Sequence, residues 1–480
     1  EPPQALRSAL GVPLRERRWE VAPPAVDAGA VPRGTVAVLA GPGSEALARR
    51  TMALLAPQTD CVLLREGEGE GQGDGEGPGT GRGEPAFHDE ASARRILDGL
   101  PGLSGLLDLT DVARPDGGPG PWTARVVILQ ELIRRHRGEL RVLQVTQGLQ
   151  DLPGTRPSLA GSRVAGFVRM LGVEYPRVRA THLDTDLALP EAIAAEWRAA
   201  GPSAEVCHRD GRRLLPRWTE VAEAAATDPF LADPERAYLV TGGTRGLGSR
   251  VARHLVARGA RRIALTCLRE LPVRERWDAP GLSAETAEAV ATVRDLEGAG
   301  VQVRVFTGAL SGRARLSAFL TEVRTVLGPV GGVVHCAGLG SRGPAAFVHK
   351  RSDDIREVFE PKTAGLETLA ELCGSDRPDF FVLFSSVSSA LPQLAAGISD
   401  YAAANTGADF VAGHLTRLGR VRVRAVQWPV WADGSAGKAA RDSSQGAGIG
   451  LLSTDDGLAV LDWAMTSDGP SVVLPAPRLV

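Results

Sequence analysis

The stretch at residues 237–266, AYLVTGGTRGLGSRVARHLVARGARRIALT, restricts the fold of this chain more than any other. An apolar run of strand length leads into a glycine-rich turn, the turn opens a helix, and a second apolar run follows. Glycines there allow a tight bend and let a pyrophosphate approach the backbone, while the helix N-terminus attracts negative charge. A purely structural turn is the alternative, but the strand–turn–helix context favours a dinucleotide site.

Charge near this turn bears on the choice of cofactor. An acidic residue about 20 positions after the turn would hold an adenosine ribose and favour NAD. The strand IALTCLRE instead offers Arg269 before Glu270, and Arg245 lies within the turn itself. Two arginines suit a 2′-phosphate, so the sequence favours NADPH over NADH. The candidate cofactor contacts in the turn are Thr241, Gly242, Gly243, Thr244, Arg245, Gly246, Leu247 and Gly248.

The rest of the chain alternates apolar runs of strand length with helical patterns, which predicts a parallel α/β sheet. In the first half we expect strands at residues 19–21, 35–41, 105–112, 141–148 and 178–184, helices at 91–97, 122–137 and 159–171, and a closing hairpin at 205–218. In the second half, beyond residue 266, we expect helices at 284–298, 316–327 and 355–373, strands at 301–306, 331–338, 380–386 and 421–428, and a last helix and strand within 458–474.

The two halves follow the same pattern. GLLDLTDV in the first half matches GGVVHCAG in the second, RVLQVTQG matches FFVLFSSV, and VRATHLD matches VRAVQWP. In the first half, however, the glycine turn has decayed to AGPGSEA and no tyrosine stands at the position matching Tyr401. We therefore predict an ancient duplication, with a structural subdomain at residues 1–225 and a catalytic subdomain at 226–480.

Two polar stretches interrupt the pattern. Residues 66–84, EGEGEGQGDGEGPGTGRGE, cannot bury apolar surface and predict a mobile, solvated loop. Residues 432–450, ADGSAGKAARDSSQGAGIG, are small and polar, as suits a lid that orders over a substrate.

Three polar residues of the second half form a candidate proton-donating set: Lys362, Ser386 and Tyr401. Tyr401 and Asn405 are four apart and share a face of one helix, while Ser386 ends the apolar run DFFVLFSS. A serine hydroxyl can hold a carbonyl oxygen, and a tyrosine can protonate it if a nearby ammonium eases formation of the phenolate. Alone, Tyr401 and Asn405 could equally be core residues with satisfied hydrogen bonds.

Composition excludes several other classes of protein. The net charge of −2 leaves no electrostatic footprint for nucleic acid or an anionic membrane. The five cysteines are scattered and never paired as CxxC, so we expect neither disulfides nor a metal site. Neither a signal peptide nor a run of 18 apolar residues is present, so we expect a soluble, cytoplasmic protein.

These motifs resemble the short-chain dehydrogenase/reductase superfamily, and more closely the ketoreductase domain of modular polyketide synthases. The resemblance rests on TGGTRGLG, HCAG, FSS, YAAAN and a lysine at position 362 in place of one four residues after the tyrosine, where Asn405 stands. It covers nearly the whole chain and implies two tandem Rossmann-like parallel-sheet subdomains, the first degenerate and structural, the second catalytic.

The resemblance also implies a reaction. NADPH would reduce a β-ketoacyl chain carried on the phosphopantetheine of an acyl carrier protein, within a polyketide synthase whose other domains are neighbours. It implies a catalytic tetrad of Lys362, Ser386, Tyr401 and Asn405. Within the HCAG run, the cofactor-wall residues would be Cys336, Ala337 and Gly338.

Three departures from the family pattern are visible. The gap of 15 positions from Ser386 to Tyr401 is longer than usual, so Ser388 is an alternative to Ser386. Leu268 and Ala309 stand where the family has an arginine and an aspartate near the adenosine. The LDD run that marks one stereochemical class is replaced by GSR at 340–342, and the tryptophan that marks the other class is absent, with Leu391 near its place.

Two rival functions stay open at this point. A non-reducing structural or docking domain of a polyketide synthase is compatible with Leu268 and Ala309, although the complete tetrad argues against it. A free-standing NADPH alcohol dehydrogenase is disfavoured by the long first half, which carries no catalytic residues.

Overall fold

The computed structural model describes residues 10–26, 34–67, 85–114, 118, 120–199, 204–221, 229–419, 421–434 and 437–477. The elements of the first half are β1 (Leu14–Val21), β2 (Thr35–Ala40), α1 (Glu45–Leu55), β3 (Asp60–Glu66), β4 (Ala86–Phe87), α2 (Glu90–Asp98), β5 (Leu103–Asp108), α3 (Trp122–Arg135), β6 (Leu140–Gln147), α4 (Ser162–Glu174), β7 (Val178–Thr185), α5 (Pro190–Arg198), β8 (Glu205–Arg209) and β9 (Arg212–Glu220).

The second half begins with β10. Its elements are β10 (Ala237–Thr241), α6 (Gly246–Ala257), β11 (Arg262–Cys267), η1 (Arg274–Arg276), α7 (Ala284–Gly298), β12 (Gln302–Thr307), α8 (Arg313–Val326), β13 (Val330–His335), η2 (Phe347–His349), α9 (Ser352–Lys362), α10 (Ala364–Cys373), η3 (Gly374–Asp376), β14 (Phe380–Ser386), α11 (Val387–Ala390), η4 (Pro392–Leu394), α12 (Ser399–Arg417), β15 (Val423–Trp428), α13 (Lys438–Gly446), α14 (Thr454–Thr466) and β16 (Val472–Pro475).

The strand order confirms the predicted α/β architecture with two tandem units. The first half runs β4-β3-β2-β5-β6-β7-β8 and the second runs β12-β11-β10-β13-β14-β15-β16, so each strand has a counterpart. The pairs within each run are parallel. The sequence matches between the halves therefore join structurally equivalent strands. The predicted boundary at residue 225 lies outside the described residues, and the division there stays a prediction.

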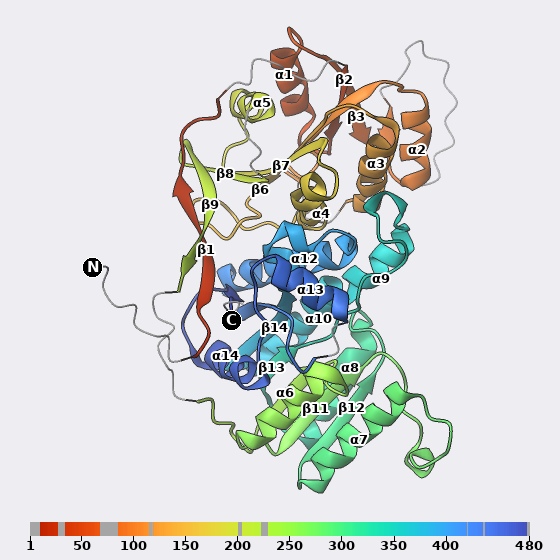
Figure 1. The fold of residues 1–480 in the computed structure, drawn as a ribbon, viewed down its shortest axis with the longest axis vertical. Coiled ribbons are helices and arrows are strands. Elements are labelled where there is room, and N and C mark those ends of the chain that lie inside the picture. The colour runs from red at the N-terminus through yellow and green to blue at the C-terminus, as the bar shows by residue number, and fades with distance from the viewer. Residues whose placement is uncertain are drawn as a thin grey trace, which may run out of the picture.

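An antiparallel connection turns the two runs into one 16-stranded sheet. β1 pairs with β9 on one side (Figure 1) and with β16 on the other. The sequence predicted only a short strand at 19–21 within a lead-in. That prediction understated β1, because its largely charged sequence LRERRWEV carries no strand alternation and does not identify its partners. β9 follows β8 through Asp210 and Gly211, which both have positive φ, as the predicted hairpin turn requires.

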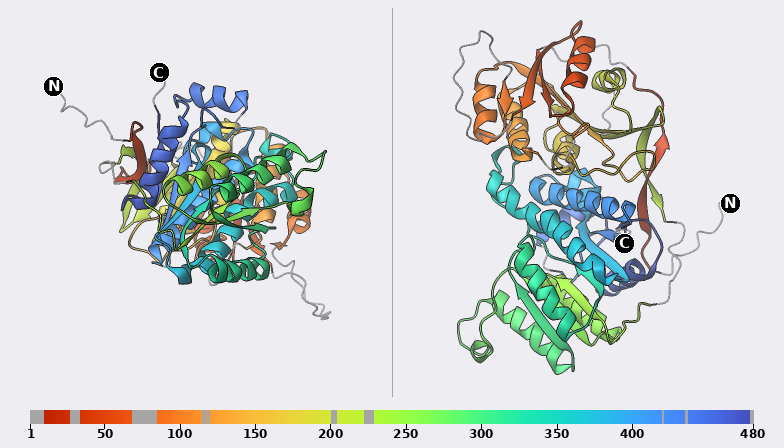
Figure 2. Two further views of the ribbon diagram at one scale, coloured as in Figure 1. Left: turned by 90° about the horizontal axis from the view of Figure 1, so that it is seen from below. Right: turned by 180° about the vertical axis from the view of Figure 1, so that it is seen from behind.

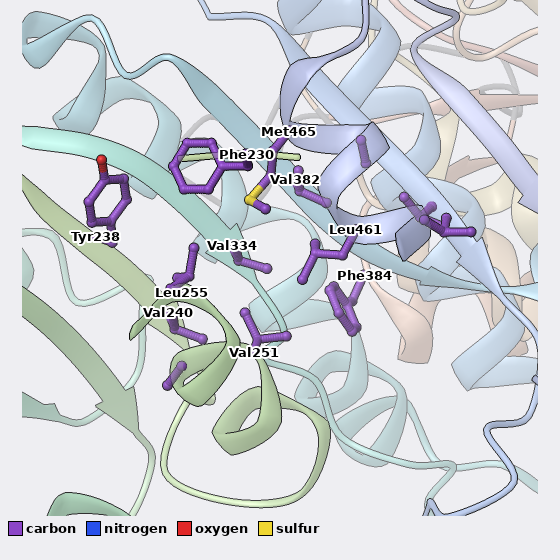
Figure 3. Packing of buried hydrophobic residues seen from close by; sticks show 14 of the residues in the cluster. Phe230, Tyr238, Val240, Val251, Leu255, Val334, Val382, Phe384, Leu461 and Met465 are labelled. Carbon is purple, nitrogen blue, oxygen red and sulfur yellow. The ribbon is translucent and has the colours of Figure 1, made fainter. Parts of the chain in front are cut away.

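Alternating strand residues face two helical layers in the second half. On one face, Tyr238 and Val240 of β10 and Val382 and Phe384 of β14 pack against α6 and α14 (Figure 3). The intervening residues, such as Leu239 and Leu383, pack on the other face against α8, α10 and α12. Both faces of the parallel strands are buried, which explains their continuous apolar runs.

A shared core joins the halves through helices. Figures 1 and 2 show α3 and α4 of the first half lying against α9 and α12 of the second. Phe167 of α4 packs 5.2 Å from Phe347 and 5.7 Å from Phe359, measured between ring centroids. α4 and α12 approach closely at Gly166, where a Cβ atom would lie 2.7 Å from the carbonyl oxygen of Ala403. Helix α12, which carries Tyr401 and Asn405, thus rests directly on the first half.

Some predicted elements differ from the structure. The single helix expected at 355–373 is two helices, because Pro361 lies inside α9 and Thr363 leaves the helical region with φ −121° and ψ −87°. No strand was predicted for β3 or β4, and no helix for α5. Within 432–450 the structure places helix α13. Most of the glycine and glutamate tract, residues 68–84, lies outside the described residues.

We predict that Gly166→Leu lowers both stability and turnover. The new side chain must displace α12 beside Tyr401 and Asn405, and overpacking of this kind costs about 1–3 kcal/mol. Urea unfolding and a reductase assay measure the two effects. Gly298→Ala is the control, because that helical glycine has open space around it. A Gly166→Leu protein with wild-type stability and rate would show that the halves are not coupled here.

Candidate active site

The glycine turn has the geometry of an anion cradle. Gly242 and Gly246 have φ of +63° and +53°, which other residues rarely adopt. A Cβ atom on Gly248 would lie 2.2 Å from the carbonyl oxygen of Gly242, so the turn closes only when position 248 has no side chain. Space is open around Gly246, the first residue of α6, and the N-cap residue Arg245 makes no side-chain capping bond. These features fit a dinucleotide pyrophosphate.

The two predicted phosphate-binding arginines converge. The nearest Nη atoms of Arg245 and Arg269 lie 3.1 Å and 2.9 Å from one oxygen of Glu285. Arg269 is 78% exposed and Arg245 45% exposed, so both can reorient toward a bound anion. Leu268, where the family has an arginine, is 58% exposed and contributes no charge.

A buried histidine ties the turn to the end of α9. The Nε2 atom of His335 lies 3.0 Å from the carbonyl oxygen of Pro361, and Nδ1 lies 2.9 Å from the Thr241 hydroxyl. A carbonyl only accepts, so Nε2 carries the proton and Nδ1 accepts from Thr241. Burial, with Lys362 nearby, lowers the pKa of His335 to about 3, so the ring stays neutral. The Thr241 oxygen in turn accepts from the backbone N–H of Ala337 at 3.1 Å.

Lys362 lies at the last position of α9, next to the Pro361 carbonyl that His335 holds. Its ammonium donates to the carbonyl oxygen of Phe384 in β14. Burial lowers the pKa of Lys362 to about 8, partly offset by Cys336 and Asp409. Its stem crosses Gly338, where a Cβ atom would lie 2.8 Å from Cε. The glycine after the HCA run therefore makes room for the lysine.

Ser386 ends β14 with its hydroxyl held in place. Ser386 Oγ accepts from the backbone N–H of Ser388 at 3.2 Å and from the Ser388 hydroxyl at 3.0 Å. A hydroxyl has two acceptor sites and one proton. With both acceptor sites in use, the Ser386 proton can be directed at another oxygen. Ser388 thus supports Ser386, and the side chain that meets Tyr401 is that of Ser386.

Tyr401 and Asn405 lie one turn apart on α12, as their spacing predicted. Burial raises the pKa of the Tyr401 hydroxyl, and hydrogen bonds with the side chains of Ser386 and Asn405 partly offset that rise. Asn405 is fully buried and its Nδ2 donates to the carbonyl oxygen of Tyr401 at 2.9 Å. Its Oδ1 atom has no hydrogen-bond partner among the described residues. That orphaned acceptor is available to a bound group.

Sequence reasoning missed an ion pair that holds the start of α12. Lys350 and Asp400 are both fully buried, with Nζ and Oδ1 3.0 Å apart. Asp400 also accepts from the Ser341 hydroxyl at 2.6 Å and from the Arg342 backbone N–H at 2.8 Å. Asp400 precedes Tyr401, so the pair fixes the start of α12 against the loop after β13. The acidic residue beside the tyrosine was the only local signal.

The corresponding place in the first half is filled by side chains. Arg125 is buried between Asp108 and Asp111, and hydrogen-bonds to both. A Cβ atom on Gly41 would lie 2.3 Å from the carbonyl oxygen of Thr110, so the decayed turn is covered by its neighbouring loop. No group of side chains in the described ranges could hold a metal ion, and no described helix is long and apolar enough to cross a membrane.

Comparisons with known sequences agree with this geometry. A model of the KR domain matches residues 236–433. Polyketide synthase PksL of Bacillus subtilis (strain 168) is 37% identical over 359 residues, which cover 72% of this chain and 8% of that protein. Polyketide synthase GfsB of Streptomyces halstedii is 31% identical over 409 residues, which cover 82% of this chain and 7% of that protein. The chain therefore spans less than a tenth of either relative's length.

Solved structures share the fold along the whole chain. The structure of an A1-type ketoreductase matches with a TM-score of 0.76 at 22% identity, covering 98% of this chain and 94% of that chain. A ketoreductase within a keto acid-selecting NRPS module matches with a TM-score of 0.79 at 15% identity, covering 98% of this chain and 39% of that one. Given the glycine turn, the polar set beside it and these matches, the chain belongs to the ketoreductase (KR) domains of modular polyketide synthases.

Proposed function

We propose that this chain reduces a β-ketoacyl thioester, carried on an acyl carrier protein, to the β-hydroxyacyl thioester at the expense of NADPH. The observation that carries the proposal is that Ser386 and Asn405 meet at Tyr401, while the Lys362 ammonium is held at the Phe384 carbonyl of the same strand end. His335 links Pro361, next to Lys362, to the glycine turn. The catalytic residues and the turn follow the carboxyl ends of neighbouring parallel strands, where ligands of open α/β sheets bind. When bound, NADPH supplies a hydride for the β-carbon.

Ser386 holds the ketone oxygen in this proposal. Its hydroxyl proton is free for that oxygen because Ser388 occupies its two acceptor sites. A fixed donor that needs no reorganisation stabilises the negative charge that develops on the oxygen as the carbonyl is reduced. Ser388 acts through Ser386 as a positioning residue.

Tyr401 gives its proton to the same oxygen and leaves as a phenolate. Burial makes that phenolate costly, and the hydrogen bond from the Asn405 side chain reduces the cost while the Ser386 proton is held on the ketone oxygen. The Lys362 ammonium, held at the carbonyl oxygen of Phe384 near the end of β14, adds positive charge. With a pKa of about 8 it is mostly protonated at neutral pH yet able to release a proton. Asn405 Oδ1 is available to connect Tyr401 to a water or to the cofactor ribose.

The cofactor and partner assignments belong to the same proposal. The turn from Thr241 to Gly248 would hold the pyrophosphate, Arg245 and Arg269 the 2′-phosphate, and residues 336–338 the cofactor wall. The matched relatives are polyketide synthases many times longer than this chain. The length of these relatives supports a setting in which neighbouring domains deliver the acyl chain. The cytoplasm is the location that belongs to the same proposal.

A second candidate is a non-reducing KR-like domain with a structural or docking role in a polyketide synthase. Leu268 favours it, because it supplies no charge where the family has an arginine, and Arg245 and Arg269 are already paired with Glu285. Titration with NADPH separates the two candidates, since only the reductase consumes it with a β-ketoacyl thioester surrogate.

Tyr401→Phe should abolish NADPH oxidation by the surrogate while leaving NADPH binding intact. The ring keeps its packing, but loss of the general acid costs about 10²–10⁴-fold in rate. Absorbance loss at saturating surrogate measures turnover, and NADPH fluorescence measures binding. Activity within a few-fold of wild type would move the acid role to another residue.

Ser386→Ala should lower kcat far more than Ser388→Ala. Removing a donor to a developing oxyanion costs about 3 kcal/mol, whereas Ser388 only orients that donor. The two serines are matched in size and burial, so each variant controls for the other. The opposite order of effects would assign the oxyanion to Ser388.

Lys362→Met should stabilise the fold while removing activity. The pKa of Lys362 is lowered in the folded chain, so between about pH 8 and 10.5 the unfolded chain binds more protons and stability rises with pH. Below pH 8 the full cost of the buried charge remains. Allowing for the lost hydrogen bond, the variant should gain about 2 kcal/mol at pH 7, measured by urea unfolding.

The pH dependence supplies the check on that result. The stability difference between Lys362→Met and wild type should shrink as the pH rises from 8 to 10. A difference that stays constant over this range would mean that Lys362 does not titrate there.

A further inference from the structure

Two carboxylates of helix α7 lie where the phosphates of the proposed cofactor would bind. Glu285 and Glu288 are three residues apart, so they share a face of the helix. One oxygen of Glu285 contacts both Arg245 and Arg269, at 3.1 Å and 2.9 Å. Glu288 Oε1 accepts a hydrogen bond of 2.8 Å from the backbone N–H of Gly246.

Each contact uses a donor that the proposed function assigns to a phosphate. The Gly246 amide is the first of helix α6 and faces the position expected for the pyrophosphate. Arg245 and Arg269 are the only candidates in the cofactor assignment for the 2′-phosphate. A carboxylate and a phosphate are both anionic acceptors, so they compete for the same N–H groups.

The segment that leads into α7 is packed against the helix itself. Trp277, in the segment before α7, lies under the guanidinium groups of Arg274 and Arg294, at 4.7 Å and 5.5 Å from the ring centroid. Arg294 of α7 also forms two hydrogen bonds of 2.7 Å with Asp278. Glu285 and Glu288 reach the turn only through their side chains, which can turn aside when an anion binds.

We infer that Glu285 and Glu288 are internal competitors for the phosphates of the dinucleotide, an inference that rests on the proposed NADPH site. Glu288 competes with the pyrophosphate, which NADPH and NADH share, so it weakens both. Glu285 competes with the 2′-phosphate, which only NADPH carries. Glu285 is thus a specificity-determining residue that narrows the preference for NADPH.

Dissociation constants for NADPH and NADH, measured by nucleotide fluorescence on the whole chain, test the inference. Glu288→Ala should tighten both nucleotides about two- to fivefold, the range for an exposed charge pair. Glu285→Ala should tighten NADPH by a similar factor and NADH by less, so the preference for NADPH rises. Both gains should shrink at 1 M salt, where exposed charges are screened.

Glu270→Ala is the matched control. Glu270 carries the same charge one residue after Arg269, is exposed and forms no ion pair within the described residues. Its loss should change neither constant. In a background with both Arg245 and Arg269 replaced by alanine, the effect of Glu285→Ala on NADPH should largely vanish. Melting temperatures without nucleotide, within a few degrees of wild type, verify folding, and Glu285→Gln serves as a second variant.

The outcomes separate this inference from the proposed function. An unchanged or lower preference for NADPH in Glu285→Ala, in a protein that still reduces the ketone surrogate, overturns the inference alone. If the variants bind the nucleotides more tightly than the wild type does, but neither the variants nor the wild type turn over the surrogate, the inference is supported and the reductase proposal is overturned. No binding of either nucleotide by any variant overturns both.

Discussion

The buried hydrogen bonds of His335 hold the candidate site together. The ring joins Thr241, at the start of the glycine turn, to Pro361, which precedes Lys362. Because its pKa is about 3, the imidazole stays neutral and its tautomer is set by the Pro361 carbonyl. One side chain thus fixes the distance between the proposed pyrophosphate site and the lysine. Parallel strands alone would bring these elements near each other but would not set that distance.

The first half provides the second constraint. Its own cofactor position is occupied by the Asp108–Arg125–Asp111 network, and its helices α3 and α4 carry the face on which α9 and α12 rest. Gly166 allows α4 to approach Ala403, between Tyr401 and Asn405. The geometry of the tetrad therefore depends on a subdomain for which we propose a purely structural role.

Local patterns in the sequence predicted much of the fold and of the candidate site. The glycine turn, the parallel α/β order and the shared helical face of Tyr401 and Asn405 all follow from residue spacing, and the strand order confirms the fold. Pro361 should have indicated the break between α9 and α10, since proline interrupts helices. The helical pattern on both sides masked that signal.

What could not be predicted depends on contacts between distant residues. β1 is a charged strand whose partners, β9 and β16, lie about 200 to 460 positions away, so no local pattern identifies them. The Lys350–Asp400 pair and the approach of Glu285 to two arginines are equally non-local. Such ionic contacts require the folded chain, because charge runs in a sequence usually indicate only a solvated face.

Transfer of label from NADPH carrying deuterium at both C4 positions tests the central claim most directly. With a β-ketoacyl thioester surrogate and the wild-type chain, mass spectrometry should find one deuterium in the product, at the β-carbon, and the new hydroxyl proton should come from solvent. A reduced product without deuterium at that carbon, or no product despite bound NADPH, would contradict the account.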